Sequence, residues 1–158
     1  MTARGFPDWV RGDVAATGIA GRWPIPHEGE TLPVEAGAYA LAVFLDHLMT
    51  VDLPGRGSQR LAPGWHLYLG SARGPGGLSA RIRRHFRRDR PMHWHIDRLT
   101  AAPAGIAALA VPGGNEWDLV ATLLAYSRFR AAVAGFGSTD CRRCPGRLLI
   151  PNRRVGVS

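Results

Sequence analysis

The chain has 158 residues, which is enough for one domain with a hydrophobic core. Its apolar fraction of 46% fits a globular protein, and no run approaches the ~20 apolar residues of a transmembrane helix, which excludes a membrane-spanning segment. The net charge of +8, carried by 20 arginines without a lysine, makes nucleic acid the first expectation for a partner.

The first 33 residues show no sustained hydrophobic periodicity and contain several prolines. We predict that residues 1–33 form an extended or partly ordered arm, with Trp9, Val10 and Trp23 packed against the folded domain. The N-terminus carries no continuous apolar segment, so we expect no secretory signal and a cytoplasmic location.

Apolar strands dominate the next part of the chain. Gly37–Leu45 is apolar enough for a strand buried on both faces, and Met49–Leu53 alternates as a second strand. Glycines then mark a hairpin connection, Gln59–Ala62 reads as a short third strand, and a fourth strand ends at Gly70. The front half is thus predicted to be an antiparallel meander.

The meander leads through a glycine-rich turn into an arginine-rich helix. Apolar residues four positions apart predict one stripe of this helix packed on the sheet, and they are Leu78, Ile82 and Phe86. Arg81 and His85 lie one turn apart at the edge of the stripe. We therefore expect both at the mouth of a cleft, beside the ring of Tyr68.

The second half alternates short elements and loops. After Pro91, the segment HWHIDRLT predicts a short helix, and Ile106–Val111 is predicted to be the last core strand. Asn115 is a good N-cap for a helix from Glu116 to about residue 129. The tail is predicted to be a loop with a brief apolar stretch. We divide the chain into the arm, a domain over residues 34–150 and a basic tail over residues 151–158.

The arginines near the long helix suit a phosphate backbone. A guanidinium offers planar bidentate contacts to phosphate, so we expect Arg73, Arg84 and Arg88 to bind nucleic acid, DNA first. Two simpler explanations stay open. A GC-rich genome also favours arginine over lysine, and net positive charge also serves solubility.

Two tripeptides link the chain to a known superfamily. Gly37-Ala38-Tyr39 opens the first strand, and Tyr68-Leu69-Gly70 closes the strand before the helix. The chain in this respect resembles the GIY-YIG nuclease superfamily, and the likeness extends over most of residues 37–130 through LYLGSA and ARIRRHF. The segments GAYAL, HWHID and GFGSTDC are similar to an uncharacterised branch, a domain of unknown function sometimes fused to endonuclease III-type glycosylases. The resemblance implies DNA repair, with a glycosylase as a partner.

The resemblance also implies roles for the two tyrosines. Tyr68 matches the general base or water-positioning group. Because a phenol has a pKa near 10, that role requires a bias from nearby positive charge, which Arg73, Arg81 or a metal-bound hydroxide would supply. Tyr39 matches the first motif and would stand beside Tyr68 on a neighbouring strand. The alternatives are a buried tyrosine at the sheet edge for Tyr68 and a cross-strand aromatic contact for Tyr39.

Two residues of the helix match family positions as well. Arg81 matches the arginine that contacts the scissile phosphate, where charge builds on the non-bridging oxygens during hydrolysis. Its alternative is one more solvated arginine on a basic helix. His85 resembles a histidine that binds phosphate or protonates the leaving oxygen, and it would equally serve as a core residue beside Phe86.

The resemblance implies one metal ligand. Glu116, followed by Leu119 and Val120, matches the single glutamate that binds Mg²⁺ or Mn²⁺ in the family, and magnesium needs few protein ligands because it keeps much of its water. An acidic residue is also favoured in any first helical turn by the helix dipole. Asp118 competes for the same role.

A second set of candidate ligands consists of His93, His95, Cys141 and Cys144. Together they would satisfy a tetrahedral zinc ion if the two segments met, although histidines two apart on a helix point in different directions. In the similar branch the cysteine segment reads Cys-x-Cys followed by histidine, and Arg147 stands at that histidine position here. The other interpretation is that HWHID and GFGSTDC form a branch-specific surface near the cleft.

The expected fold is α/β (α+β), a small and mainly antiparallel sheet flanked by helices. The 28 residues from Ala40 to Leu67 exceed the spacing in the similar nucleases, so an extra β-hairpin is expected between the tyrosine motifs. The expected function is a metal-dependent endonuclease that hydrolyses DNA phosphodiesters. The alternatives are a noncatalytic DNA-binding module that recruits a repair enzyme, and a zinc-stabilised structural protein.

Overall fold

The computed structural model describes residues 8–19, 32–53, 55–87, 95–100, 105–126, 129–132, 136 and 146–152. Their centre is a five-stranded sheet in the order β5-β1-β4-β7-β6, in which every described pairing is antiparallel. The strands are β1 (Gly37–Leu45), β4 (Gly64–Ala72), β5 (Gly105–Pro112), β6 (Phe129–Ala131) and β7 (Leu148–Pro151). The expected α+β class with an antiparallel sheet is confirmed.

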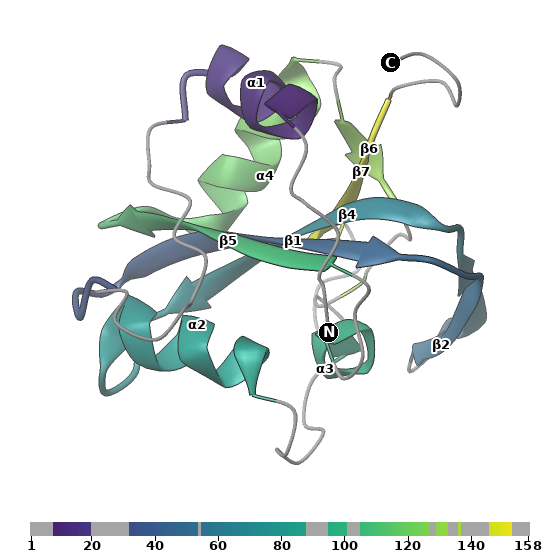
Figure 1. Ribbon diagram of the computed structural model, residues 1–158, viewed down its shortest axis with the longest axis horizontal. Coiled ribbons are helices and arrows are strands. Elements are labelled where there is room, and N and C mark those ends of the chain that lie inside the picture. Colours follow the sequence, from purple (N-terminus) through teal and green to yellow (C-terminus); the bar gives the residue numbers. More distant parts are fainter. Residues whose placement is uncertain are drawn as a thin grey trace.

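Helices cover both faces of this sheet, as Figure 1 shows. One face carries α1 (Asp8–Ala16) and α4 (Glu116–Ala125), and the other carries α2 (Gly77–Phe86) and α3 (His95–Thr100). Among the described helices, none has the length and apolar character that crossing a bilayer requires.

The two faces of β1 differ in side-chain size because successive residues of a strand point to opposite sides. Tyr39, Leu41 and Val43 join the core under α2 and α3. Alanines at positions 38, 40 and 42 face the core that α1 and α4 share. Larger side chains on the helices, such as Val10 and Leu123, fill that second core. The α2 face therefore holds the bulky tyrosine of the first tripeptide.

The predicted hairpin is present, but it leaves the main sheet. Strands β2 (Met49–Leu53) and β3 (Gly57–Leu61) pair only with each other among the described residues and form a separate two-stranded sheet. Strand β1 instead pairs directly with β4 along its whole length. The extra hairpin is thus confirmed, whereas the continuous meander is wrong. Strand β3 also begins two residues earlier than predicted and ends one residue earlier.

Three further expectations need correction or refinement. A helix, α1, lies within the stretch predicted to be extended or partly ordered, and Val10 and Trp9 pack on the domain as predicted. Trp23 lies outside the described residues. Helix α4 ends at Ala125, and residue 129 already begins β6. The strand over 106–111 is not the last core strand, because β7 pairs with β4 and its first two residues are buried.

Candidate functional site

The two tyrosines of the tripeptides lie together on the α2 face. Tyr39 stands opposite Gly70 in the β1–β4 register, and Tyr68 stands opposite Leu41, so both rings point to the same side of the sheet. Their ring centroids are 6.4 Å apart and both side chains are buried. The prediction that they stand beside each other on neighbouring strands is confirmed.

Gly70 leaves room for this arrangement. A Cβ atom at position 70 would overlap Cζ and Oη of Tyr39, because the tyrosine ring lies across the glycine from the neighbouring strand. The glycine that ends the second tripeptide therefore seats the tyrosine that ends the first one.

His85 completes a cluster with the tyrosines. Its Nε2 atom lies 2.6 Å from the hydroxyl of Tyr39, and its ring centroid is 6.4 Å from that of Tyr68. The side chain is only 1% exposed, so it does not lie at the mouth of a cleft as expected, but under α2 in the core. The packing brings Tyr39, Tyr68 and His85 together, and the hydrogen bond orients the Tyr39 phenol.

Burial controls the acidity of both phenols. It raises the pKa of Tyr39 well above its usual range, with a further increase from neighbouring Tyr68 and an opposing effect from the Arg81 charge. Burial also raises the pKa of Tyr68, against the charge and the side-chain hydrogen bond of Arg147 and the charge of Arg81. Both tyrosines are therefore neutral phenols near neutral pH, and Tyr39 has a proton to donate to Nε2 of His85.

The backbone at the start of α2 is not available to an anion. The amides of Leu78 and Ser79 donate to the carbonyls of Glu35 and Pro33 at 2.9 and 2.7 Å. Gly77 has a positive φ of 57°, and a Cβ atom there would overlap the Val34 and Glu35 carbonyl oxygens. Since these N–H groups already have acceptors, recognition of phosphate at this helix falls to side chains.

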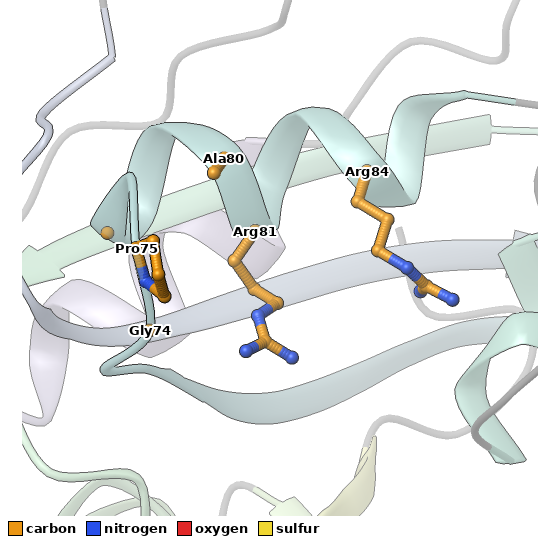
Figure 2. Close-up of a pocket in the computed structure, with 6 residues that line it drawn as sticks. Gly74, Pro75, Ala80, Arg81 and Arg84 are labelled. Carbon is orange, nitrogen blue, oxygen red and sulfur yellow. The ribbon is translucent and has the colours of Figure 1, made fainter.

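Those side chains are two arginines. Arg81 and Arg84 line an open pocket of about 230 Å³ together with the turn that precedes α2, at Gly74, Pro75, Gly77 and Ala80. Figure 2 shows both arginines projecting from the same side of the helix. The predicted position of Arg81 beside the tyrosine cluster is supported by its charge, which lowers the pKa of both phenols.

Arg84 has a more specific partner than expected. Its two terminal nitrogens donate to both carboxylate oxygens of Asp97 on α3, at 2.8 and 3.0 Å. Asp97 is fully buried, whereas a fifth of the Arg84 side chain is exposed. This bidentate pair ties α2 to α3, and Arg84 also lines the pocket. The HWHID segment thus contributes to the site through Asp97.

Glu116 begins α4 on the other face of the sheet, after the Asn115 side chain has capped the helix as predicted. One of its carboxylate oxygens, Oε2, is buried and finds no hydrogen-bond partner among the residues that the structure describes. A buried carboxylate oxygen without a partner fits a hard cation. Asp118, its competitor, is exposed.

The remaining predicted site residues are the arginines Arg73 and Arg88 and the candidate zinc ligands. Arg73 is exposed in the turn after β4. Arg88, His93, Cys141 and Cys144 lie outside the described residues, and of His95 only the backbone is described. Within the described part of the chain, no three His, Cys, Asp or Glu side chains form a metal-binding group.

Three contributors to the site were not predicted as individual residues, although Asp97 and Phe136 lie in the HWHID and GFGSTDC segments that were expected to form a surface near the cleft. Arg147 packs on the ring of Trp117 and interacts with Tyr68, and Phe136 packs edge-on against Tyr68 with 6.2 Å between ring centroids. Asp97 was the only one with a signal, because an acidic residue between Ile96 and Leu99 on a short apolar helix needs a buried partner.

Comparison with known proteins gave one match. A family model described as Domain of unknown function DUF123 matches residues 38–156, which is more than half of the chain. This range includes both tyrosines, α2, Glu116 and Arg147. No curated protein and no solved structure matches the chain significantly.

Proposed function

The chain belongs to the family described as Domain of unknown function DUF123, and from this membership and its site we propose that it is a metal-dependent endonuclease of the GIY-YIG type. Its substrate is DNA, in repair or processing. The observation that carries the proposal is the cluster of Tyr39, Tyr68 and His85 beside the Arg81 pocket. These are the residue types, at the positions, that the resemblance to GIY-YIG nucleases names.

Hydrolysis of a phosphodiester requires few protein side chains. Hydrolysis joins a water oxygen to phosphorus and breaks one ester P–O bond, while negative charge builds on the non-bridging oxygens. Arg81 would hold those oxygens. Tyr68, as a neutral phenol, would position the attacking water rather than exist as a stored phenolate, because burial raises its pKa. His85 would hold Tyr39, and through it the aromatic cluster, in a fixed geometry.

A divalent cation fits Glu116 better than any other described carboxylate of the predicted site, because its Oε2 atom is buried and without a hydrogen-bond partner in the described part of the chain. Mg²⁺ or Mn²⁺, when bound there, would supply Lewis-acid stabilisation to a phosphate that reaches the start of α4. Asp97 already has Arg84 as its partner.

One observation favours a second candidate function, a noncatalytic DNA-binding module that recruits a repair enzyme. The pKa values of both tyrosines are raised, so neither phenol is an effective base near neutral pH. A net charge of +8 would by itself sustain salt-sensitive binding to DNA.

The variant Glu116→Gln distinguishes the two functions. Purified protein would be incubated with supercoiled, branched and single-stranded DNA in the presence of Mg²⁺ or Mn²⁺. We expect wild-type cleavage that Glu116→Gln abolishes without weakening DNA binding, and that the matched variant Asp118→Asn retains. Salt-sensitive binding without cleavage of any substrate would instead support the noncatalytic module. Equal cleavage by wild type and Glu116→Gln would contradict the role of Glu116.

A further inference from the structure

Arg147 has its main chain fixed at the start of β7. Its carbonyl accepts a hydrogen bond from the Leu69 amide at 2.9 Å, and its amide donates to the Phe136 carbonyl at 2.8 Å. Leu69 follows Tyr68 directly, and the Phe136 ring packs against Tyr68. The Arg147 backbone is therefore held on both sides by the segments that surround the Tyr68 ring.

The Arg147 side chain interacts with residues of two elements, Trp117 of α4 and Tyr68 of β4. Its guanidinium carbon lies 5.0 Å from the centroid of the Trp117 ring on α4, which is within the range of a cation–π interaction. Its Nε atom is buried and has no hydrogen-bond partner among the described residues. On the α2 side, the guanidinium donates a hydrogen bond to Tyr68. Trp117 follows Glu116 in the chain, so Arg147 connects the helix of the candidate metal ligand with the tyrosine cluster.

The charge of Arg147 lowers the pKa of both phenols, although Arg147 lies far from both tyrosines in the sequence. Among the influences that oppose burial of Tyr68, the charge of Arg147 is the largest, ahead of its hydrogen bond and ahead of the Arg81 charge, while buried Asp97 acts in the opposite direction. The same arginine also lowers the pKa of Tyr39, after Arg81. Arg147 thus adds its positive charge to that of Arg81, which was predicted from the sequence.

We propose that Arg147 is a positioning residue of the site, whose guanidinium stacks on Trp117, fixes the phenol of Tyr68 and ties it to the start of α4. Its kinetic consequence rests on the proposed nuclease function. A cation held in this place keeps the Tyr68 oxygen oriented and makes its phenolate easier to form. Lysine would keep the charge but would lose the planar stack and the fork of donors.

The test is a titration of the tyrosines by the ultraviolet absorbance of tyrosinate, which requires no enzyme activity. The full chain contains three tyrosines, and Tyr126, at 51% exposed, is an internal reference. The variants are Arg147→Gln, Arg147→Lys and, as a matched control, Arg130→Gln on the exposed side of neighbouring β6. Each is also made in a Tyr68→Phe background.

We expect Arg147→Gln to raise the pKa of Tyr68 and, to a smaller extent, that of Tyr39, because a cation beside a phenolate stabilises it. Arg147→Lys should restore part of the shift, and Arg130→Gln should cause none. The Tyr68 shift should vanish in the Tyr68→Phe background, where only the smaller effect on Tyr39 remains. On DNA, Arg147→Gln should lower kcat with little change in KM, because the neutral Tyr68 phenol would lose its fixed orientation toward the attacking water.

Two results would overturn the inference: an unchanged titration in folded Arg147→Gln protein, or a shift of undiminished size in the Tyr68→Phe background. If the chain lacks nuclease activity but the Tyr68 shift appears, the proposed function fails and the positioning of Tyr68 by Arg147 stands. If wild type cleaves DNA while the shift is absent, the function stands and the inference fails. Retention of the near-ultraviolet circular dichroism spectrum shows which variants are folded.

Discussion

Gly70 and Tyr39 show how one residue without a side chain determines the position of another residue's ring. We predict that Gly70→Ala destabilises the fold by about 1–3 kcal/mol, because the new methyl group overlaps the Tyr39 ring and forces it to shift. The shift would also disturb the hydrogen bond to His85. Urea unfolding measures the loss.

Gly74→Ala is the matched control for this variant. A Cβ atom at position 74 would meet only the end of the Arg81 side chain, at 3.8 Å, which is an ordinary contact. Its free energy of unfolding should stay close to that of wild type. Equal losses in the two alanine variants would show that the seat of Tyr39 is not the cause.

His66 gives the stability a dependence on pH. Burial lowers its pKa from 6.5, against a hydrogen bond from Nδ1 to the Gly64 carbonyl. As pH falls below 6.5, the unfolded chain takes up a proton that the folded chain refuses until its lower pKa is reached, so stability decreases through that interval. The loss is about 1.4 kcal/mol for each unit between the two pKa values.

The test is urea unfolding of wild type and His66→Gln from about pH 8 to about pH 5, a range that brackets the reference pKa of histidine. The variant should lose less stability than wild type on acidification, because it has removed the proton uptake of the unfolded chain. Identical slopes for wild type and His66→Gln would contradict this account.

Among the elements, α2 and α3 are joined by the pair of Arg84 and Asp97. We predict that Arg84→Ala costs about 3 kcal/mol of stability, because it leaves a fully buried carboxylate without its cation. Arg83→Ala on the same helix removes an exposed arginine and should cost less than about 0.5 kcal/mol. Replacing both partners, Arg84→Met with Asp97→Leu, should recover part of the loss. Equal effects of the two single variants in urea unfolding would refute the pair's importance.

Elements with sustained patterns could be predicted from the sequence, and short elements could not. The apolar run of β1 and the four-residue spacing in α2 gave correct placements because each extends over nine or ten residues. Strands β6 and β7 have three and four residues, too few to show an alternation. Helix α1 has only two turns and contains Gly12, which reads as a helix breaker. Its stability comes from Val10 and Val14 packing on the sheet.

At the scale of the whole molecule, the candidate site draws on both faces of the sheet. The pair Tyr39 and Tyr68 was predictable from the resemblance of the two tripeptides to the GIY-YIG motifs, and the β1–β4 register brings both rings to the same side. Arg147 was not predictable, since it lies far along the chain from Tyr68 and only the pairing of β7 with β4 brings them together. The burial of His85 could not be predicted either, because a histidine at the edge of a helical apolar stripe is compatible with both the core and the surface.

The measurement that tests the proposed site most directly is the rate of DNA cleavage by Arg81→Ala compared with Arg83→Ala. The two arginines share a helix and a charge, but only Arg81 lines the pocket beside the tyrosine cluster, whereas Arg83 is exposed. We predict that Arg81→Ala lowers kcat by about 100-fold or more, the usual effect of removing a group that stabilises transition-state charge, while Arg83→Ala changes it little. Equal rates for the two variants would contradict the assignment of this pocket as the site of phosphodiester hydrolysis.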